Sequence, residues 1–234
     1  MKLLSNNNKL AKGEKLGFLS LGIHLSPHDK SGYNVCPWAS KGCAMACLDT
    51  AGMGSFSNVQ DSRIKKTRFF FEDKQGFFCK LAHEIGLAVK RASKKGLIPC
   101  FRLNLTSDLP WEAIRNADRK TIFELFPNTQ FYDYSKGFSR MRNYLAGKMP
   151  SNYHLTFSRS ESNQAHCEII LKLGGNVACV FRNELPKTSQ RLGKRKRVIN
   201  GDVSDLRFRD PKGCIVGLVE KGRAKKDETG FVLN

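Results

Sequence analysis

The sequence predicts an α/β protein, either a partial (β/α)6 barrel or another mostly parallel sheet covered by helices. Short segments rich in β-branched and aromatic residues alternate with longer amphipathic segments along the chain. Several short segments are almost continuously apolar, which is typical of strands covered on both faces. No internal repeat or low-complexity linker divides the 234 residues. We therefore expect a single domain over residues 1–234.

Six segments have the composition of strands, and four longer segments between them have the pattern of helices. The expected strands cover residues 18–25, 98–105, 130–134, 153–157, 176–181 and 214–219. The expected helices cover about residues 57–71, 75–93, 111–125 and 160–173. Ser57 and Gln60 have the spacing of a capping box, Ser160 can cap the last helix, and the two glycines 174–175 would end it.

The charge of the chain restricts its partners. Forty Lys and Arg residues stand against 21 Asp and Glu, which leaves a formal net charge of +19. A fold does not need this charge, which costs self-repulsion. We expect a polyanionic partner, and nucleic acid (DNA or RNA) rather than a membrane, because no clean basic amphipathic helix is present. A generally basic, highly soluble surface is the alternative.

Positive charge is densest in residues 183–200, where the alternation of strands and helices breaks. Glu184 is the only acid in this segment. We expect an exposed loop that contacts phosphates, with a solvated charged loop as the alternative. The residues expected to contact nucleic acid are Arg191, Lys194, Arg195, Lys196 and Arg197.

Neither a membrane span nor an export signal is visible. No stretch of about 18 apolar residues is present. Asn6, Asn7 and Asn8 stand where a signal peptide would be apolar. We expect a cytoplasmic protein.

Cys36, Cys43 and Cys47 form a C-x6-C-x3-C motif directly after the first expected strand. If Cys43 and Cys47 lie on one helical turn, their spacing places them on the same face. Pro37 and Gly42 would let the intervening loop bring Cys36 back toward them. Three thiolates could then share one inorganic centre. The other five cysteines lie among apolar neighbours and are expected to be buried, inert thiols: Cys79, Cys100, Cys167, Cys179 and Cys214.

Three kinds of site fit this motif. An iron–sulfur cluster held by three cysteines would leave one iron open for a small molecule, and we favour it. A structural zinc would need a fourth ligand. The candidates for that ligand are His24, His28, Cys79 and His83. In the third case there is no metal, and the cysteines pack the loop.

Polar residues also follow the other expected strands. Ligands of α/β proteins collect at the carboxyl ends of strands, so we expect these residues to meet the cysteines. Helix capping alone would account for part of the signal at Ser107 and Ser160. The polar residues after the second, third and fourth strands include Asn104, Ser107, Asp108, Glu112, Lys136, Ser158, Arg159 and Glu161.

This order of motifs resembles small, phage-encoded radical S-adenosylmethionine proteins. The resemblance rests on the cysteine motif, on Ser-Asp-Leu at 107–109, on Ser-Lys at 135–136, and on residues 152–163. The segment Asn-Val-Cys-Pro with the later Gly-Cys, Cys-Leu and Ala-Gly pairs is also similar to tailed-phage proteins. The resemblance covers residues 17–219, and it implies a six-stranded partial barrel.

The resemblance also implies roles for these residues. Cys36, Cys43 and Cys47 would hold a [4Fe-4S] cluster that works with S-adenosylmethionine. The expected catalytic residues are Asp108, Glu112 and Lys136, and the expected cofactor-binding residues are Asn104, Ser107, Ser158, Arg159 and Glu161. If the chain is encoded by a phage, its location is the host cytoplasm.

Three functions follow from these expectations. The first is a radical S-adenosylmethionine-type enzyme that modifies a nucleic acid or nucleotide. The second is a base-exchange or glycosyl-transfer enzyme braced by zinc, with Asp108 as nucleophile or base on a target that leaves the base stack. The third is a nucleic-acid-binding module without catalysis, in which a metal only braces a loop.

Overall fold

A ten-stranded sheet forms the centre of the computed structural model, which describes residues 1–234 apart from the side chain of Thr50. The strand order is β1-β2-β3-β4-β5-β6-β9-β8-β7, with β10 paired to β6. The strands are β1 (Leu4–Ser5), β2 (Phe18–Ile23), β3 (Ile98–Arg102), β4 (Gln130–Ser135), β5 (Tyr153–Ser158), β6 (Val177–Phe181), β7 (Thr188–Ser189), β8 (Lys196–Asn200), β9 (Ile215–Val219) and β10 (Val232–Leu233).

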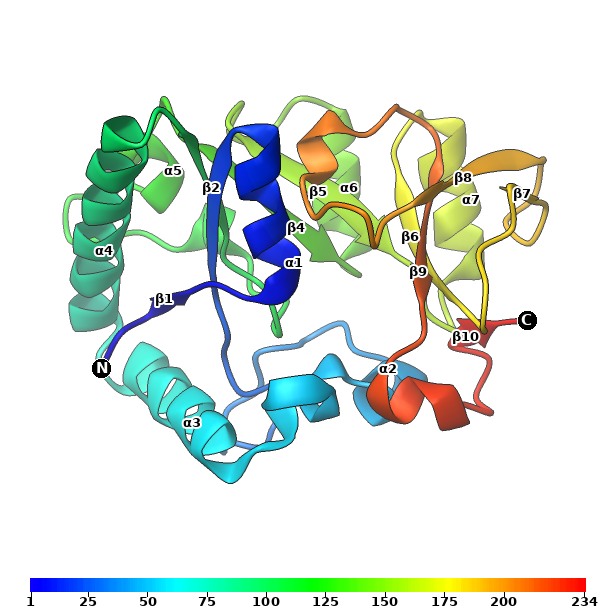
Figure 1. Cartoon of the computed structure of the whole chain (residues 1–234), viewed down its shortest axis with the longest axis horizontal. Coiled ribbons are helices and arrows are strands. Elements are labelled where there is room, and N and C mark those ends of the chain that lie inside the picture. The colour runs from blue at the N-terminus through cyan, green and yellow to red at the C-terminus, as the bar shows by residue number, and fades with distance from the viewer.

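The predicted α/β class and all six predicted strands are confirmed. Strands β2, β3, β4, β5, β6 and β9 are parallel neighbours in the order of the chain. Their carboxyl ends therefore lie along one edge of the sheet. In Figure 1, β2 and β9 both run toward the lower edge of the view, where α2 and α3 lie.

Helices cover mainly one face of the sheet, with α4 at one side and α7 at the other (Figure 1). The α-helices are α1 (Asn8–Ala11), α2 (Lys41–Met45), α3 (Ser57–Glu72), α4 (Lys74–Lys94), α5 (Ile122–Leu125), α6 (Phe138–Leu145) and α7 (Gln164–Lys172). The 3-10 helices cover Lys12–Leu16, Leu48–Thr50, Gly52–Ser55, Trp111–Ala113, Arg207–Arg209 and Gly222–Lys226.

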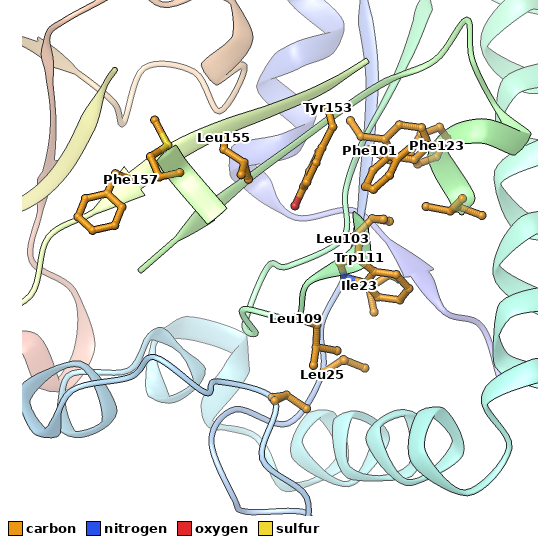
Figure 2. Packing of buried hydrophobic residues seen from close by; sticks show 14 of the residues in the cluster. Ile23, Leu25, Phe101, Leu103, Leu109, Trp111, Phe123, Tyr153, Leu155 and Phe157 are labelled. Atoms are coloured by element: carbon orange, nitrogen blue, oxygen red, sulfur yellow. The ribbon is translucent and has the colours of Figure 1, made fainter. Parts of the chain in front are cut away.

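Alternation along the strands builds the main core. Phe101 and Leu103 at β3, and Tyr153, Leu155 and Phe157 on β5, point to the face that carries the longer helices, where all five belong to one buried cluster. Figure 2 shows Phe101 and Tyr153 near Phe123 of α5, with Leu155 and Phe157 farther along β5. Because both faces of the sheet are covered, several strands are almost continuously apolar, and this pattern predicted them from the sequence.

The opposite face of the sheet carries a smaller cluster. Leu10 of α1 and Leu206 pack there against Cys100 of β3 and Tyr132 of β4. Tyr132 OH lies 2.7 Å from Ser20 Oγ, so the buried hydroxyl of Tyr132 is satisfied within the sheet.

The sheet opens between β5 and β6 at its carboxyl edge. The two strands pair only at Phe157–Val177 and Ser158–Ala178. Beyond that point β10 takes the place beside β6, with Val232 opposite Val180. The end of β5 is therefore free to turn toward the cysteine segment.

The helix predicted over residues 111–125 is wrong. Only a 3-10 helix at Trp111–Ala113 and the short α5 form there. Asn116 closes a turn with Lys120 instead, through a backbone bond of 2.9 Å and a side-chain bond of 2.8 Å. Arg119 has a φ of 61°. Local bonding of this Asn competes with the helix.

Two predicted helix caps are wrong, although α3 begins at Ser57 as predicted. The N-cap of α3 is Phe56, whose side chain makes no capping bond, and Ser57 is already helical. Helix α7 begins at Gln164 rather than near Ser160, whose backbone N–H binds Asn163 Oδ1 at 2.7 Å. The predicted ends of both helices are close to the observed ones.

Four of the five scattered cysteines are buried as predicted, but Cys79 is exposed on α4. The basic segment is not simply a loop, because β7 and β8 pair within it as an antiparallel hairpin. Strand β8 also extends the sheet beside β9. Among the described residues, every helix is too short or too polar to cross a membrane.

Candidate functional site

The three clustered cysteines lie at the carboxyl edge of the parallel strands. Cys36 is in the loop after β2, Cys43 is in α2, and Cys47 begins the next 3-10 helix. Helix α2 starts at Lys41 because Ser40 Oγ accepts the N–H of Cys43 at 3.2 Å. All three side chains are partly buried.

The three thiols share one environment. Burial, with a smaller contribution from negative charge on Cys43, raises the pKa of Cys36 to about 11. Burial also raises the pKa of Cys47 to about 12, with further contributions from Asp49, Cys43 and Cys36. Cys43 therefore lies within electrostatic range of both Cys36 and Cys47.

The described side chains do not include three His, Cys, Asp or Glu residues arranged around one ion site. In a [4Fe-4S] cluster each thiolate binds a different iron atom, so the three sulfurs do not converge on one point. Three soft thiols with mutual electrostatic contact are a donor set that fits such a cluster.

Loops from β2 and β3 meet at Cys36. Cys36 Sγ accepts the N–H of His28 at 3.5 Å and lies 3.8 Å from the carbonyl oxygen of Thr106. The N–H of Asp108 donates to the carbonyl of Val35 at 2.8 Å. The loop after β3 therefore fixes the position of Cys36.

Lys136, which follows β4, is the predicted catalytic residue that lies beside the thiols. Burial lowers the pKa of Lys136, but Cys43 and Asp108 raise it more, and the net shift is upward. Its Nζ donates to Ser158 Oγ at 3.1 Å and lies 5.6 Å from the ring centre of Phe231. Lys136 is therefore a cation held next to the cysteine sulfurs.

The two predicted catalytic carboxylates are bound to one arginine. Arg140 donates from Nη1 to Asp108 at 2.7 Å, and from Nε and Nη2 to Glu112 at 2.6 and 2.8 Å. Its guanidinium also lies 5.3 Å from the ring of Trp38. Burial raises the pKa of Asp108, and Arg140 opposes that shift. In this arrangement the carboxylates position the loops around Lys136, whose N–H donates to Asp108 at 2.8 Å.

Asn104 and Ser107, predicted to bind cofactor, hold the loop after β3. Asn104 Oδ1 accepts from Ser107 Oγ at 2.8 Å, from Leu109 N at 2.9 Å and from Trp111 Nε1 at 3.3 Å. Its Nδ2 donates to the carbonyl of Leu109 at 3.0 Å and to Asp133 at 3.3 Å. The hydrogen-bonding groups of the Asn104 side chain are all used within the protein.

Glu161 connects the loop after β5 to the cysteine motif. Its carboxylate accepts from Ser40 Oγ at 2.8 Å and from the N–H of Gly42 at 2.7 Å. A Cβ at Gly42 would lie 2.3 Å from Thr229 Oγ1 and 2.7 Å from Glu161 Oε2. A larger residue at position 42 would therefore force the side chains of Thr229 and Glu161 to move.

Arg159 connects the same loop to the C-terminal segment. Its Nη1 donates to the carbonyls of Gly230 and Phe231 at 2.7 and 2.8 Å. The end of β5 thus brings Ser158, Arg159 and Glu161 to one region, as predicted, although each already has partners in the protein.

Four polar residues near the carboxyl edge of the sheet were not among the predicted site residues. Tyr134 and Thr156 are opposite each other on β4 and β5, and the hydroxyls of both are buried without a partner. Arg63 and Lys66 of α3 are buried. The signal for these two was their spacing: they share the inward helix face with Thr67 and Phe70, at positions where apolar residues are expected.

The predicted nucleic-acid contacts lie apart from the cysteines, on and beside the hairpin of β7 and β8. Four of these residues are exposed and Lys196 is partly buried. Arg191 Nη2 donates to the carbonyl of Asn234 at 2.9 Å, and Arg195 Nε donates to Thr188 Oγ1 at 2.9 Å. Positive charge therefore covers the hairpin, as the sequence predicted.

Comparison with known proteins gives one relationship. No curated protein and no solved structure matches this chain. One family model, described as Gene product 88, matches residues 1–234. The chain therefore belongs to the Gene product 88 family, a phage-type protein family.

Proposed function

We propose that this protein is a radical S-adenosylmethionine-type enzyme that modifies a nucleic acid or a nucleotide. The observation that carries the proposal is the position of Cys36, Cys43 and Cys47. Their thiols interact with one another directly after the first of six parallel strands that follow in chain order. This is the arrangement that the resemblance implies for the cluster of these enzymes.

With a [4Fe-4S] cluster on these cysteines, the site would gain reductive cleavage of S-adenosylmethionine and hydrogen abstraction from a substrate as its chemistry. The residues around the thiols have separate tasks. The Lys136 ammonium offsets negative charge on the sulfurs, and Ser158 orients it. Glu161 fixes the start of α2. Arg140 holds the loops after β3 and β4 together.

The unpartnered hydroxyls of Tyr134 and Thr156, two positions before Lys136 and Ser158, support a small-molecule ligand at the carboxyl edge of the sheet. Buried polar groups are normally satisfied, and exceptions mark functional sites. Arg102 lies on the same face, 4.5 Å from the ring centre of Tyr134, and is itself paired with Asp205. The net charge of +19 supports nucleic acid as the larger partner.

Metal analysis of anaerobically purified protein tests the proposal. We expect brown protein with about four irons per chain, as one [4Fe-4S] cluster requires, and visible absorbance that dithionite bleaches. Cys36→Ala, Cys43→Ala and Cys47→Ala should each lose iron, whereas Cys79→Ala is the matched control because Cys79 is exposed on α4. Colourless protein with one zinc per chain would overturn the proposal.

One observation favours a nucleic-acid-binding module without catalysis as the second candidate. Asp108, Glu112 and Glu161 are all engaged in holding loops together, which leaves none of them free as an acid or base. A Cys36→Ala protein separates the two functions. Unchanged affinity and salt dependence of nucleic-acid binding, together with absent iron in the wild type, would support the binding module.

A further inference from the structure

Two cations on α3 lie mostly inside the protein, and no carboxylate of the described residues is within ion-pair distance of either of them. Arg63 is 8% exposed and Lys66 is 7% exposed. Lys66 makes no hydrogen bond or ion pair with any described residue. Arg63 donates only from Nη1, to the carbonyl of Asp49 at 3.4 Å, and its Nε is buried without a partner.

These cations converge with others at the carboxyl edge of the sheet. His24 follows β2, and burial lowers its pKa to about 3 with help from the charges of Arg63, Lys66 and Arg102. His24 is therefore neutral and cannot balance charge. The pKa of Arg63 is lowered by burial and raised by Asp49 and Cys47, so this group borders the cysteine site.

The nearby acids are already engaged. Asp49 is paired with Lys30. Asp205 is paired with Arg102 at 3.0 Å. Glu84, whose charge acts on Lys66, accepts backbone N–H groups of β1 and its neighbour at 2.8 and 2.9 Å. Asp49 and Glu84 act on Arg63 and Lys66 only at longer range, so neither cation has an acid in direct contact.

A cation that is largely removed from water and has no acid bonded to it destabilises the fold. A protein that retains two such charges one helical turn apart has a use for them, and an anion is the ligand that they would bind. Two cationic side chains match the charge and the oxygen acceptors of a phosphate better than those of a single carboxylate.

We propose that Arg63 and Lys66 form a phosphate-binding site beside the cysteine motif. The phosphate belongs to a nucleotide or to a nucleic-acid end, an assignment that rests on the proposed function. The site would hold the substrate by its phosphate while the group to be modified faces the cysteines. Phosphate binding itself requires no metal.

Calorimetry and thermal unfolding of the full chain with inorganic phosphate test the site, with acetate at equal ionic strength for comparison. Phosphate should bind at least tenfold more tightly than acetate and raise the Tm. Lys66→Met should weaken phosphate binding at least tenfold and should not lower the Tm in phosphate-free buffer, because it removes an unpaired charge. Lys66→Arg should bind phosphate within a few-fold of wild type.

Lys65→Met is the matched control, because Lys65 is exposed on the same helix. It should bind phosphate like the wild type. Equal loss in Lys65→Met and Lys66→Met, or equal binding of acetate and phosphate, would overturn the site. A Lys66→Met protein that is less stable without phosphate, yet still binds it, would also overturn the site.

Two further measurements separate this proposal from the enzyme function. Cys36→Ala should retain phosphate binding, so the phosphate site does not depend on the outcome of the iron analysis. Loss of phosphate binding in Cys36→Ala would overturn a phosphate site that is independent of the metal. Nucleoside 5′-monophosphates should displace inorganic phosphate, while the unphosphorylated nucleosides should not. Failure of the monophosphates to compete would overturn the nucleotide assignment.

Discussion

Gly42 illustrates how single residues set the shape of the cysteine site. In Gly42→Ala the new Cβ would overlap Thr229 and Glu161. We expect a loss of about 1–3 kcal/mol in the free energy of unfolding, together with reduced iron binding. Denaturant titration and iron analysis measure the two effects.

Gly86→Ala is the control for this prediction. Gly86 is within α4, and a Cβ added there would have no atom within 4 Å. Alanine at this position should stabilise the protein by about 0.5–1 kcal/mol. The prediction would be contradicted if Gly42→Ala left the free energy of unfolding and the iron content unchanged. In that case the close packing around α2 would affect neither stability nor iron binding.

Arg140 serves two buried carboxylates with one guanidinium. Arg140→Met should destabilise the protein by about 3–5 kcal/mol, because Asp108 and Glu112 would lose their cation. The loss should shrink as the pH falls, since protonation neutralises the two acids. Urea titrations at several pH values measure this, and Arg142→Met, an exposed change on the same helix, should have little effect.

His154 predicts a second pH effect. Burial, with help from Arg207, lowers its pKa from 6.5 to about 4. As the pH falls, His154 therefore takes up a proton in the unfolded chain before it does so in the folded protein. The contribution of neutral His154 to the free energy of unfolding is complete above pH 6.5 and declines as the pH falls toward 4. The free energy of unfolding should fall by about 3 kcal/mol because of His154 alone.

His154→Gln should flatten that part of the stability curve. His83→Gln is the control, because His83 is exposed on α4. Parallel curves for wild type and His154→Gln between pH 6.5 and 4 would contradict the pKa shift of His154.

At the scale of elements, the sequence predicted the parallel strands. It did not predict the side-chain contacts of the candidate site. The strand at Val177–Phe181 is apolar along its whole length because both its faces are covered. Helix α6 was missed because its inward face includes the charged Arg140. The contact of Glu161 with Gly42 spans 119 residues, and no local pattern records such a contact.

The sequence therefore predicted several residues that lie at the candidate site, but it did not predict which contacts they make there. Strand ends placed Lys136 and Glu161 near the cysteines, because parallel strands share one carboxyl edge. Which carboxylate binds a cation, and which caps a helix, depends on side chains from distant loops. Asp108 is an example, since its partner Arg140 is on α6.

Docking of β10 gives a prediction about an element. Arg159 fixes this strand through the carbonyls of Gly230 and Phe231. Arg159→Met should release the C-terminal segment, so amide exchange at Val232 and Leu233 should become at least tenfold faster while β4 stays protected. Arg195→Met, an exposed arginine of the basic hairpin, is the control. Unchanged exchange in Arg159→Met would show that β6 and Asp227 hold β10 without Arg159.

At the scale of the whole molecule, the charge is spread over both ends of the sheet. The hairpin of β7 and β8 carries exposed cations at one side, and the end of α4 carries Lys90, Arg91 and Lys94 at the other (Figure 1). If only the net charge attracts nucleic acid, the hairpin and the end of α4 should contribute equally to binding. If the hairpin contacts nucleic acid directly, it should contribute more than α4.

Salt dependence distinguishes a dedicated contact from general attraction. Each phosphate contact contributes about 0.7 (single strand) to 0.9 (B-DNA) to the slope of log Kobs against log salt. If Lys194 and Arg195 contact phosphates, the double variant Lys194→Gln/Arg195→Gln should reduce the slope by about 1–2. The double variant Arg91→Gln/Lys94→Gln removes the same charge from α4 and should leave the slope nearly unchanged. Equal reductions in both variants would mean that the net charge of +19 attracts nucleic acid without a defined contact at the hairpin.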